Sequence, residues 1–344
     1  MAAALRIAVI GLGRWGPNHV RVFHATKGCT VVAAADPADA SRDRVSTAFP
    51  DVECVADYRR VLARADVDAV VVSTPTATHH AVVAEALKAG KHVLCEKPLA
   101  SSSAEAWQLE KLSRESGLIL MVGHVFLFNP GIEYLCQAVR EQLAGKLYYA
   151  TAIRTNLGPF RNDVNAAWDL ASHDIYILNA VFSGHPTRVS AIGESYLRPP
   201  VEDIVFLTLQ YPDDVVAHIH VSWLDPRKVR QITLVGEKKM ITWDEFGTPG
   251  PIMLYDRSVV RDPVYSTFGE FQLLAREGDV VLPRVQTGEP LAAQAKAFAD
   301  IVANRRTGFT TGSARQGAEV VDILEAATRS LGRDGALQEV RYAQ

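Results

Sequence analysis

The sequence predicts an α/β domain with a doubly wound parallel sheet, followed by an α+β domain built on a large, mostly antiparallel open sheet. Two observations predict this fold class. Short apolar runs alternate with segments of helical composition up to about residue 122, whereas longer alternating runs separated only by turns begin at about residue 147. A chain of 344 residues also exceeds what one hydrophobic core usually organises. We therefore expect two domains, at residues 1–125 and 126–344.

Six apolar runs in the first part have the length of strands. Some of them, such as Val70-Val71-Val72, are apolar on both faces, as expected for parallel strands covered by helices on each side. The segments between them have helical length, and one of these, residues 79–89, stops at Gly90. The expected strands are residues 5–10, 30–35, 52–55, 68–72, 92–95 and 118–122.

The second part reads as strands joined by turns. A helix around residues 169–182 interrupts them, and a final helical stretch at residues 291–331 closes the chain. The clearest expected strands are residues 205–211, 215–223, 229–235 and 239–243.

Composition narrows the class of protein. With 48% hydrophobic and 22% charged residues the chain has globular composition, and no run approaches the ~18 apolar residues of a membrane span. The net charge of −3 provides no basic field for nucleic acid or anionic lipid, so we expect neither as a partner. Residues 1–5 do not resemble an export signal, and the four cysteines are scattered without metal-ligand spacing. These features predict a cytoplasmic protein without a metal site.

A glycine motif, Gly11-Leu12-Gly13-Arg14-Trp15-Gly16, directly follows the first strand and opens a helical segment. In this context Gly11 permits a tight turn, Gly13 lets the backbone approach a pyrophosphate, and Gly16 allows close packing of helix and strand. The helix N-terminus then meets the phosphates with unpaired N–H groups and the positive end of its dipole. The motif predicts a dinucleotide site.

Asp36 ends the second strand, twenty residues after Gly16. A carboxylate there can accept hydrogen bonds from the adenosine ribose, which favours NAD over NADP. Arg42 lies close enough in sequence to contact a 2′-phosphate, so NADP remains an alternative. The other interpretation is a glycine turn that binds no nucleotide, with Asp36 as a helix cap.

Three further segments carry a resemblance to a known family. They are S-T-P-T-A-T-H at residues 73–79, G-K-H-V-L-C-E-K-P-L at residues 90–99 and W-D-L-A-S-H-D at residues 168–174. Together they resemble the glucose-fructose oxidoreductase, inositol dehydrogenase and MocA family over essentially the whole chain. The resemblance implies a Rossmann domain, a second domain whose sheet often forms the oligomer interface, and hydride exchange with a sugar-like alcohol. Many members have an arginine where this chain has Leu127, so no role of that arginine carries over.

The resemblance also implies a cofactor site assembled from several loops. In it, Thr74 and Pro75 shape the nicotinamide side of the pocket. His79 and His80 begin a helix and are expected to pack or cap it, and Trp15 and Trp223 are also candidates for packing. The expected cofactor-binding residues are Gly11, Gly13, Arg14, Trp15, Gly16, Asp36, Ser73, Thr74, Pro75, His79, Glu96 and Lys97.

Three residues suit the oxidation of a secondary alcohol, which needs a base for the hydroxyl proton and a positive donor for its oxygen. His173 titrates near neutral pH, and Asp169 lies four residues earlier on the same helical face, where it can orient the imidazole. Tyr176 shares this polar side. Lys97 follows a parallel strand at the edge where such sheets bind ligands, and its ammonium can polarise the reacting oxygen.

Each of these residues also has a structural interpretation. Asp169 can cap the helix, His173 can be a partly buried, hydrogen-bonded histidine, and Lys97 can be an exposed lysine before a turn. The family context of the two motifs favours the catalytic interpretation.

These residues predict an NAD-dependent dehydrogenase of a sugar. The stretches G-R-W-G-P-N at residues 13–18 and D-V-N-x-x-W-D-L at residues 163–170 resemble family members that modify nucleotide sugars. This resemblance implies a nucleotide-linked sugar of the UDP-N-acetylhexosamine type, oxidised at C3, as the substrate. The segment before the catalytic helix is expected to be a loop lining the substrate site, with arginines suited to phosphate. The alternative interpretation is that Arg154 and Arg161 form surface or subunit-interface ion pairs, which are common and contribute little energy. Two alternative functions remain: an inositol or free-sugar dehydrogenase, and a nucleotide-sensing protein that catalyses no reaction.

We expect a homodimer or homotetramer formed through the second sheet. The expected substrate-binding residues are Arg154, Asn156, Arg161, Asn165 and Tyr176, with Asn162 in the same segment.

Overall fold

A computed structural model describes residues 4–161, 163–261, 273–304 and 308–343 of the chain. The chain forms two compact units. The first contains residues 1–128, 288–325 and 342–344, and the second contains residues 129–287 and 326–341. The expected division at residue 125 assigns every later residue to the second domain, whereas residues 288–325 belong to the first compact unit.

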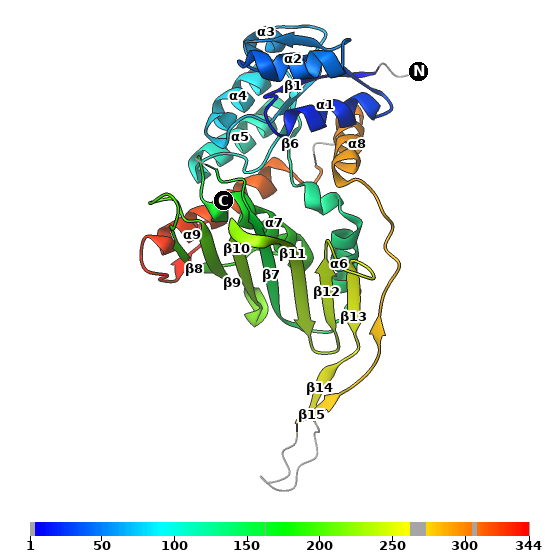
Figure 1. The fold of residues 1–344 in the computed structure, drawn as a ribbon, viewed down its shortest axis with the longest axis vertical. Helices are drawn as coiled ribbons and strands as arrows, with labels where there is room; N and C mark the ends of the chain where they lie inside the picture. The colour runs from blue at the N-terminus through cyan, green and yellow to red at the C-terminus, as the bar shows by residue number, and fades with distance from the viewer. Residues whose placement is uncertain (1–3, 162, 262–272, 305–307, 344) are drawn as a thin grey trace. The chain divides into compact units, whose positions relative to one another are not determined.

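The first unit is built on a parallel sheet with strand order β3-β2-β1-β4-β5-β6 (Figure 1). This order reverses between β1 and β4, which is the switch point of a doubly wound sheet and the place where such sheets bind ligands. The predicted parallel sheet is therefore confirmed. Its strands are β1 Leu5–Ile10, β2 Cys29–Ala35, β3 Glu53–Val55, β4 Ala69–Val72, β5 His92–Cys95 and β6 Leu120–Val122.

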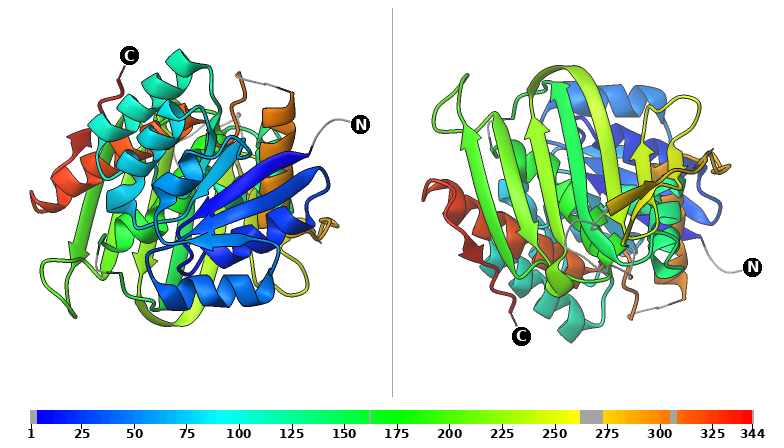
Figure 2. Two further views of the ribbon diagram at one scale, coloured as in Figure 1. Left: turned by 90° about the horizontal axis from the view of Figure 1, so that it is seen from above. Right: turned by 90° about the horizontal axis from the view of Figure 1, so that it is seen from below.

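Helices cover both faces of this sheet (Figure 2, left). The helix α5 shows how local sequence sets the ends, because Ser102 accepts a hydrogen bond from the Glu105 N–H at its start and Gly117 has a φ of +67° at its end. The helices are α1 Gly16–Ala25, α2 Asp39–Ala48, α3 Tyr58–Leu62, α4 Thr76–Lys88, α5 Ser103–Ser116, η1 Val125–Phe128, α8 Pro290–Ala303 and the first part of α9 Ala314–Leu331.

The core of the first unit joins the sheet to α1 and α8. Phe23 of α1 and Phe298 of α8 are fully buried and meet edge to face, with ring centroids 6.1 Å apart. The late segment thus completes a core that begins with β1. It is two helices rather than the single stretch expected over residues 291–331, since α8 ends at Ala303 and α9 starts at Ala314.

The second unit is built on a nine-stranded sheet in the order β16-β13-β12-β11-β7-β10-β9-β8-β17. Its pairs are antiparallel except for β7 with β10, which run parallel. A separate pair, β14 with β15, is also antiparallel. The predicted, mostly antiparallel sheet is confirmed. The strands are β7 Leu147–Leu157, β8 Arg188–Glu194, β9 Ile204–Gln210, β10 Val216–Ser222, β11 Leu224–Gly236, β12 Met240–Asp244, β13 Ile252–Tyr255, β14 Ser258–Arg261, β15 Leu273–Arg276, β16 Val280–Val281 and β17 Gln338–Glu339.

Helices pack against one face of this sheet. In Figure 1 the strands lie in front of α6 Pro130–Arg140, α7 Ser172–Phe182 and the end of α9. Side chains on the covered face, such as Leu207 and Ile219, are fully buried, whereas alternate positions such as Phe206 and His218 are exposed. A short helix, η3 Pro212–Asp214, joins β9 to β10.

Candidate active site

Two glycines of the loop after β1 are required by the packing of the first unit. A Cβ on Gly16 would lie 2.0 Å from the carbonyl oxygen of Gly11, and a Cβ on Gly11 would lie 2.7 Å from the carbonyl carbon of Ser73. Gly11 also has a φ of +90°. Ser73, after β4, donates from Oγ to the Gly11 carbonyl at 2.7 Å and so ties the two loops together.

Gly13 is different, because no atom lies within 4 Å of where its Cβ would be. Protein packing therefore does not require glycine at this position, and the open space lies beside the N-terminus of α1. That helix has no acidic residue in its first turn and no side-chain hydrogen bond at its N-cap, Trp15. These features fit a bound pyrophosphate, which would use the space and the helix N-terminus.

Asp36 links the end of β2 to the glycine loop. Its Oδ2 accepts a hydrogen bond from the Leu12 N–H at 2.7 Å, and its Oδ1 accepts one from the Ala38 N–H at 2.8 Å. Because a carboxylate has about four lone-pair sites, the side chain keeps acceptor capacity for a ribose hydroxyl. The helix-cap alternative is wrong, because Ala38 is the N-cap of α2 and that helix has no side-chain cap hydrogen bond. The role of Asp36 toward a ribose stays a prediction that this acceptor capacity supports.

Two arginines of α2 hold this region. The Arg42 guanidinium donates to the carbonyls of Asp36 and Pro37 and pairs with Asp39, so its donors are engaged within the chain. Arg44 donates to the Leu12 carbonyl at 2.7 Å and to the Gly13 carbonyl at 3.2 Å. Arg44 was missed by sequence reasoning, because only the fold brings α2 against the glycine loop.

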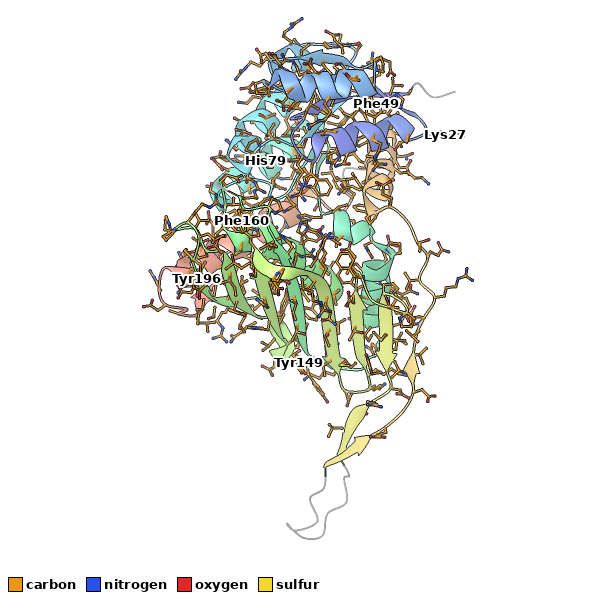
Figure 3. All side chains as sticks on the ribbon, in the orientation of Figure 1. Lys27, Phe49, His79, Tyr149, Phe160 and Tyr196 are labelled. Atoms are coloured by element: carbon orange, nitrogen blue, oxygen red, sulfur yellow. The ribbon has the colours of Figure 1, made fainter. Side chains whose placement is uncertain are left out.

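The loops after β4 and β5 are joined by His79. This buried side chain of α4 contacts the Thr74 carbonyl through Nε2 at 2.9 Å and the Pro98 carbonyl through Nδ1 at 2.8 Å. Pro75 is the N-cap of α4, and Thr74 accepts a hydrogen bond from Thr78. His79 therefore fixes the loops expected around the nicotinamide, as the packing interpretation predicted, and Figure 3 labels it in the first unit.

The exposed residues of the glycine loop are Gly13, Arg14 and Trp15. Trp15 is 45% exposed, so the expectation that it packs in the interior is wrong, because as the N-cap of α1 it lies at the surface. Trp223 is fully buried, as expected of a packing residue. It also donates from Nε1 to Asp169 Oδ2 at 3.1 Å, a contact that its apolar surroundings in the sequence did not indicate.

In the second unit the W-D-L-A-S-H-D motif forms a π-helical turn, η2 Ala167–Ala171, that continues into α7. Such turns are frequent at functional sites. Asp169 lies in the π turn and His173 in the first turn of α7, and both are partly buried. His173 Nδ1 lies 2.9 Å from the hydroxyl of Tyr176, which fixes one edge of the imidazole.

Asp169 is held by two donors. Its Oδ1 accepts from Arg161 at 3.3 Å, in addition to the contact of Oδ2 with Trp223. Arg161 is also paired with Asp163 through two hydrogen bonds, of 2.9 Å and 2.5 Å. The structure thus brings Asp169 and Arg161 together, two residues assigned to the site from the sequence.

Arg154 departs from the prediction. The segment from Arg154 to Leu157 belongs to β7 rather than to a loop, and the Arg154 side chain is buried on the helix-covered face. There it forms a two-pronged ion pair with the buried Asp174, at 2.9 Å and 3.0 Å. The alternative of a surface or subunit-interface ion pair also does not describe Arg154, because the pair is buried inside the second unit. Arg154 is a structural part of that unit.

The asparagines of the segment form hydrogen bonds within the second unit, mostly with nearby backbone groups. Asn156 donates to the Gly158 carbonyl, and Asn165 accepts from the Trp168 N–H while donating to Glu202. Asn162 lies outside the described residues. Two exposed aromatic side chains, Phe160 and Tyr196, are labelled on loops of this unit in Figure 3.

His19 is a further buried polar residue that sequence reasoning missed. It lies in the first turn of α1 and contacts Glu96, the residue before Lys97. The only local signal was a histidine three residues after Gly16. Within the described ranges, no helix is both long and apolar enough to cross a membrane. The same residues form no cluster of three or more metal-ligating side chains.

Comparison with known proteins covers both units. A model of an oxidoreductase family with an NAD-binding Rossmann fold matches residues 5–124, and a model of the GFO/IDH/MocA C-terminal domain matches residues 133–242. The UDP-N-acetylglucosamine 3-dehydrogenase of Acidithiobacillus ferrooxidans is 27% identical over 306 residues, which cover 88% of this chain and 93% of that protein.

Inositol 2-dehydrogenase 2 of Paenarthrobacter aurescens is 30% identical over 229 residues, covering 63% of this chain and 68% of that protein. Among solved structures, GenD2 from gentamicin A biosynthesis, in complex with NAD, has a TM-score of 0.82 at 24% identity. The match covers 99% of this chain and 97% of GenD2, and it shows that the two share a fold.

Proposed function

Because the chain belongs to the glucose-fructose oxidoreductase, inositol dehydrogenase and MocA family, as its motifs predicted, we propose that it transfers a hydride between NAD and a secondary alcohol of a nucleotide-linked sugar. It is an oxidoreductase acting on CH–OH groups, with a Rossmann domain of the NAD-binding type. The observation that carries the proposal is the start of α7, where His173 and Asp169 are both partly exposed and each is held by a neighbour.

The residues divide the chemistry among them. Lys97 holds the reacting oxygen and polarises it with its ammonium group. His173 takes the hydroxyl proton at Nε2, because Nδ1 is the ring nitrogen engaged with the Tyr176 hydroxyl. Asp169, which is held by Arg161 and Trp223, orients the His173 imidazole. NAD supplies the hydride acceptor when bound, and the glycine loop, Asp36 and the loops tied by His79 are the residues that would hold it.

The substrate class rests on two features. The similarity to the UDP-N-acetylglucosamine enzyme spans most of both chains, whereas the inositol dehydrogenase match covers about two thirds of each. Arg161 is partly exposed next to Asp169 and can offer a guanidinium to a phosphate. The second candidate is an inositol or free-sugar dehydrogenase, which the higher identity of the inositol enzyme favours.

We also propose that the protein is a cytoplasmic homodimer or homotetramer assembled through the nine-stranded sheet. The four cysteines are all unpaired, which suits a reducing compartment. The face of the sheet opposite the helices carries exposed apolar side chains in its central strands, including Tyr149 of β7, Phe206 of β9 and Val216 of β10.

The proposed chemistry is tested by turnover. Purified protein is mixed with NAD and a panel of UDP-sugars, dTDP-sugars, free hexoses and inositols, and reduced nicotinamide is followed by absorbance. With the best substrate, Lys97→Ala and His173→Asn should each lower turnover by roughly 10²-fold or more, as is typical of lost acid–base or oxyanion partners. NAD affinity should stay nearly unchanged.

Lys111→Ala and His80→Asn, at positions away from these loops, are matched controls that should turn over normally. Near-normal turnover of both site variants would refute the catalytic assignment. Reaction with inositol or a free hexose alone, with no binding of nucleotide sugars, would replace the substrate class by the second candidate.

A further inference from the structure

A buried hydrogen bond joins α1 to the residue that precedes Lys97. His19 Nε2 lies 2.7 Å from Glu96 Oε1, and the side chains are 1% and 15% exposed. An ionised carboxylate can only accept, so His19 carries the proton on Nε2. Nδ1 of His19 is buried and has no hydrogen-bond partner among the described residues, so Nε2 makes the ring's one hydrogen bond within this part of the structure.

The Glu96 carboxylate is also confined on its other side. Its Oε2 accepts from the Lys97 backbone N–H at 3.3 Å. A Cβ on Gly123 would lie 3.1 Å from Oε2, and the Gly123 N–H donates to the Cys95 carbonyl at 2.7 Å. The backbone after β6 therefore forms a close wall beside the carboxylate, and Glu96 is fixed between this wall and His19.

The electrostatic surroundings keep this carboxylate charged. Burial would raise the pKa of Glu96, but the hydrogen bond from His19, the charge interaction with His19 and then the positive charge of Lys97 outweigh it and lower the pKa below the ordinary value. Burial and the neighbouring Glu96 raise the pKa of the Cys95 thiol, and burial together with Lys97 lowers the pKa of His124 to about 3. Cys95 and His124 are consequently neutral at neutral pH, whereas Glu96 and Lys97 attract each other as opposite charges.

We propose that His19 is a positioning residue that holds the Glu96 carboxylate ionised and in place beside Lys97, and thereby keeps Lys97 in its ammonium form. The proposal rests on the proposed function, in which that ammonium polarises the substrate oxygen. Without the Nε2–H donor, Glu96 can rotate or take up a proton. The attraction that favours a positive charge on Lys97 is then lost, and Lys97 releases its proton at a lower pH.

The test compares His19→Asn with His19→Gln. The glutamine amide nitrogen reaches the place of Nε2 and keeps the donor, whereas the asparagine side chain is one methylene too short. The primary measurement is the titration of the Lys97 ε-methylene carbon by NMR in protein labelled with ¹³C-lysine, assigned with Lys97→Arg. It needs neither substrate nor turnover, and it is repeated with NAD bound.

In His19→Asn the Lys97 titration should move to lower pH by roughly one unit, which is a tenfold change in its proton affinity. The basic limb of the pH profile of kcat/KM should move with it. His19→Gln should titrate like the parent protein. Glu96→Gln, which removes the charge with little change of shape, should move the Lys97 titration in the same direction as His19→Asn and covers the case in which the asparagine variant does not fold.

An unchanged Lys97 titration in His19→Asn or in Glu96→Gln would overturn the inference. Equal shifts in the asparagine and glutamine variants would also overturn it, because the donor would then not be the cause. Normal turnover of Lys97→Ala would instead refute the proposed role of Lys97, and the NMR titration would still report on His19.

Discussion

At the scale of single residues, Asp36 determines which dinucleotide we expect to bind. A 2′-phosphate placed at the ribose would face the carboxylate, and like charges ~4 Å apart repel by about 1 kcal/mol per pair even in water. Arg42, which could offset this, is engaged with Asp39 and two carbonyls. NAD should therefore bind at least roughly tenfold more tightly than NADP.

Calorimetric titration of both dinucleotides measures this preference. Asp36→Asn should reduce it, whereas Asp43→Asn, at an exposed position on the following helix α2, should leave it unchanged. Equal or reversed affinities in the parent protein would contradict the role given to Asp36, and Arg42→Ala would then show whether Arg42 binds the phosphate.

His124 makes stability depend on pH. Its pKa is lowered to about 3 by burial and by the charge of Lys97, while in the unfolded chain it has the ordinary value of 6.5. Between these values the unfolded chain holds a proton that the folded chain does not. The free energy of unfolding should thus fall by about 1.4 kcal/mol for each unit by which the pH drops below about 6.5.

Urea unfolding at several pH values between about 7 and 4 measures this slope. His124→Asn should flatten it by that amount, and His24→Asn, which changes an exposed histidine of α1, should not. Burial also lowers the pKa of His220 from its ordinary value of 6.5, so the parent slope contains both histidines, and the flattening caused by His124→Asn isolates the part due to His124. The depressed pKa of Glu96 acts in the same direction, but only below that group's ordinary value of 4.5. If the asparagine variant kept the parent slope, burial of a neutral His124 would not be the cause.

The sequence predicted those site residues whose role depends on their neighbours along the chain. Gly11, Gly16 and Asp36 lie where a strand, a turn and a helix follow one another, so their spacing alone was informative. Arg154 was assigned wrongly because its partner, Asp174, is buried against it only when β7 and α7 pack together. His19 was missed for the same reason, since Glu96 is 77 residues away in the chain.

At the scale of elements, periodicity predicted the kind of structure better than its ends. Residues 154–157 read as a loop because of their polar side chains, yet they pair with β10 and β11 and continue β7. The stretch from residue 291 to 331 has helical composition on both sides of a break. Gly312, with a φ of +72°, lies in that break and was the local sign of it.

The π turn before α7 could not be read from the sequence at all. A helical pattern fixes which side chains share a face, but one extra residue in a turn shifts that face without any change of composition. Here the turn contains Asp169, which accepts hydrogen bonds from Arg161 and from Trp223, the residue after β10. The relation between Asp169 and His173 inferred from regular helix spacing therefore remains a prediction.

At the scale of the whole molecule, the chain returns to its first unit after completing most of the second. Residues 288–325 supply α8, whose Phe298 packs on Phe23 of α1. Sequence patterns show that a helix has an apolar face but not which surface covers it. The expected single boundary near residue 125 therefore located the first crossing between the units and not the second.

The face of the nine-stranded sheet that no helix covers leads us to predict that the protein forms a homo-oligomer through this face. Phe206 is 40% and Ile192 is 59% exposed, and they are paired in register across β9 and β8 (Figure 2, right, shows the sheet). Phe206 also stacks on His220, with ring centroids 4.6 Å apart. Apolar side chains gathered on an open sheet face are typical of an interaction surface.

Sedimentation velocity at micromolar concentration should give a dimer or tetramer for the parent protein and a smaller species for Phe206→Glu. Burying an unpaired carboxylate costs at least ~3 kcal/mol, so association should weaken roughly a hundredfold or more. Leu197→Glu is the matched control, because Leu197 is an equally apolar, exposed side chain on a loop outside the strands. A monomeric parent protein, or dissociation by the loop variant and not by Phe206→Glu, would place the contact between copies somewhere other than this face.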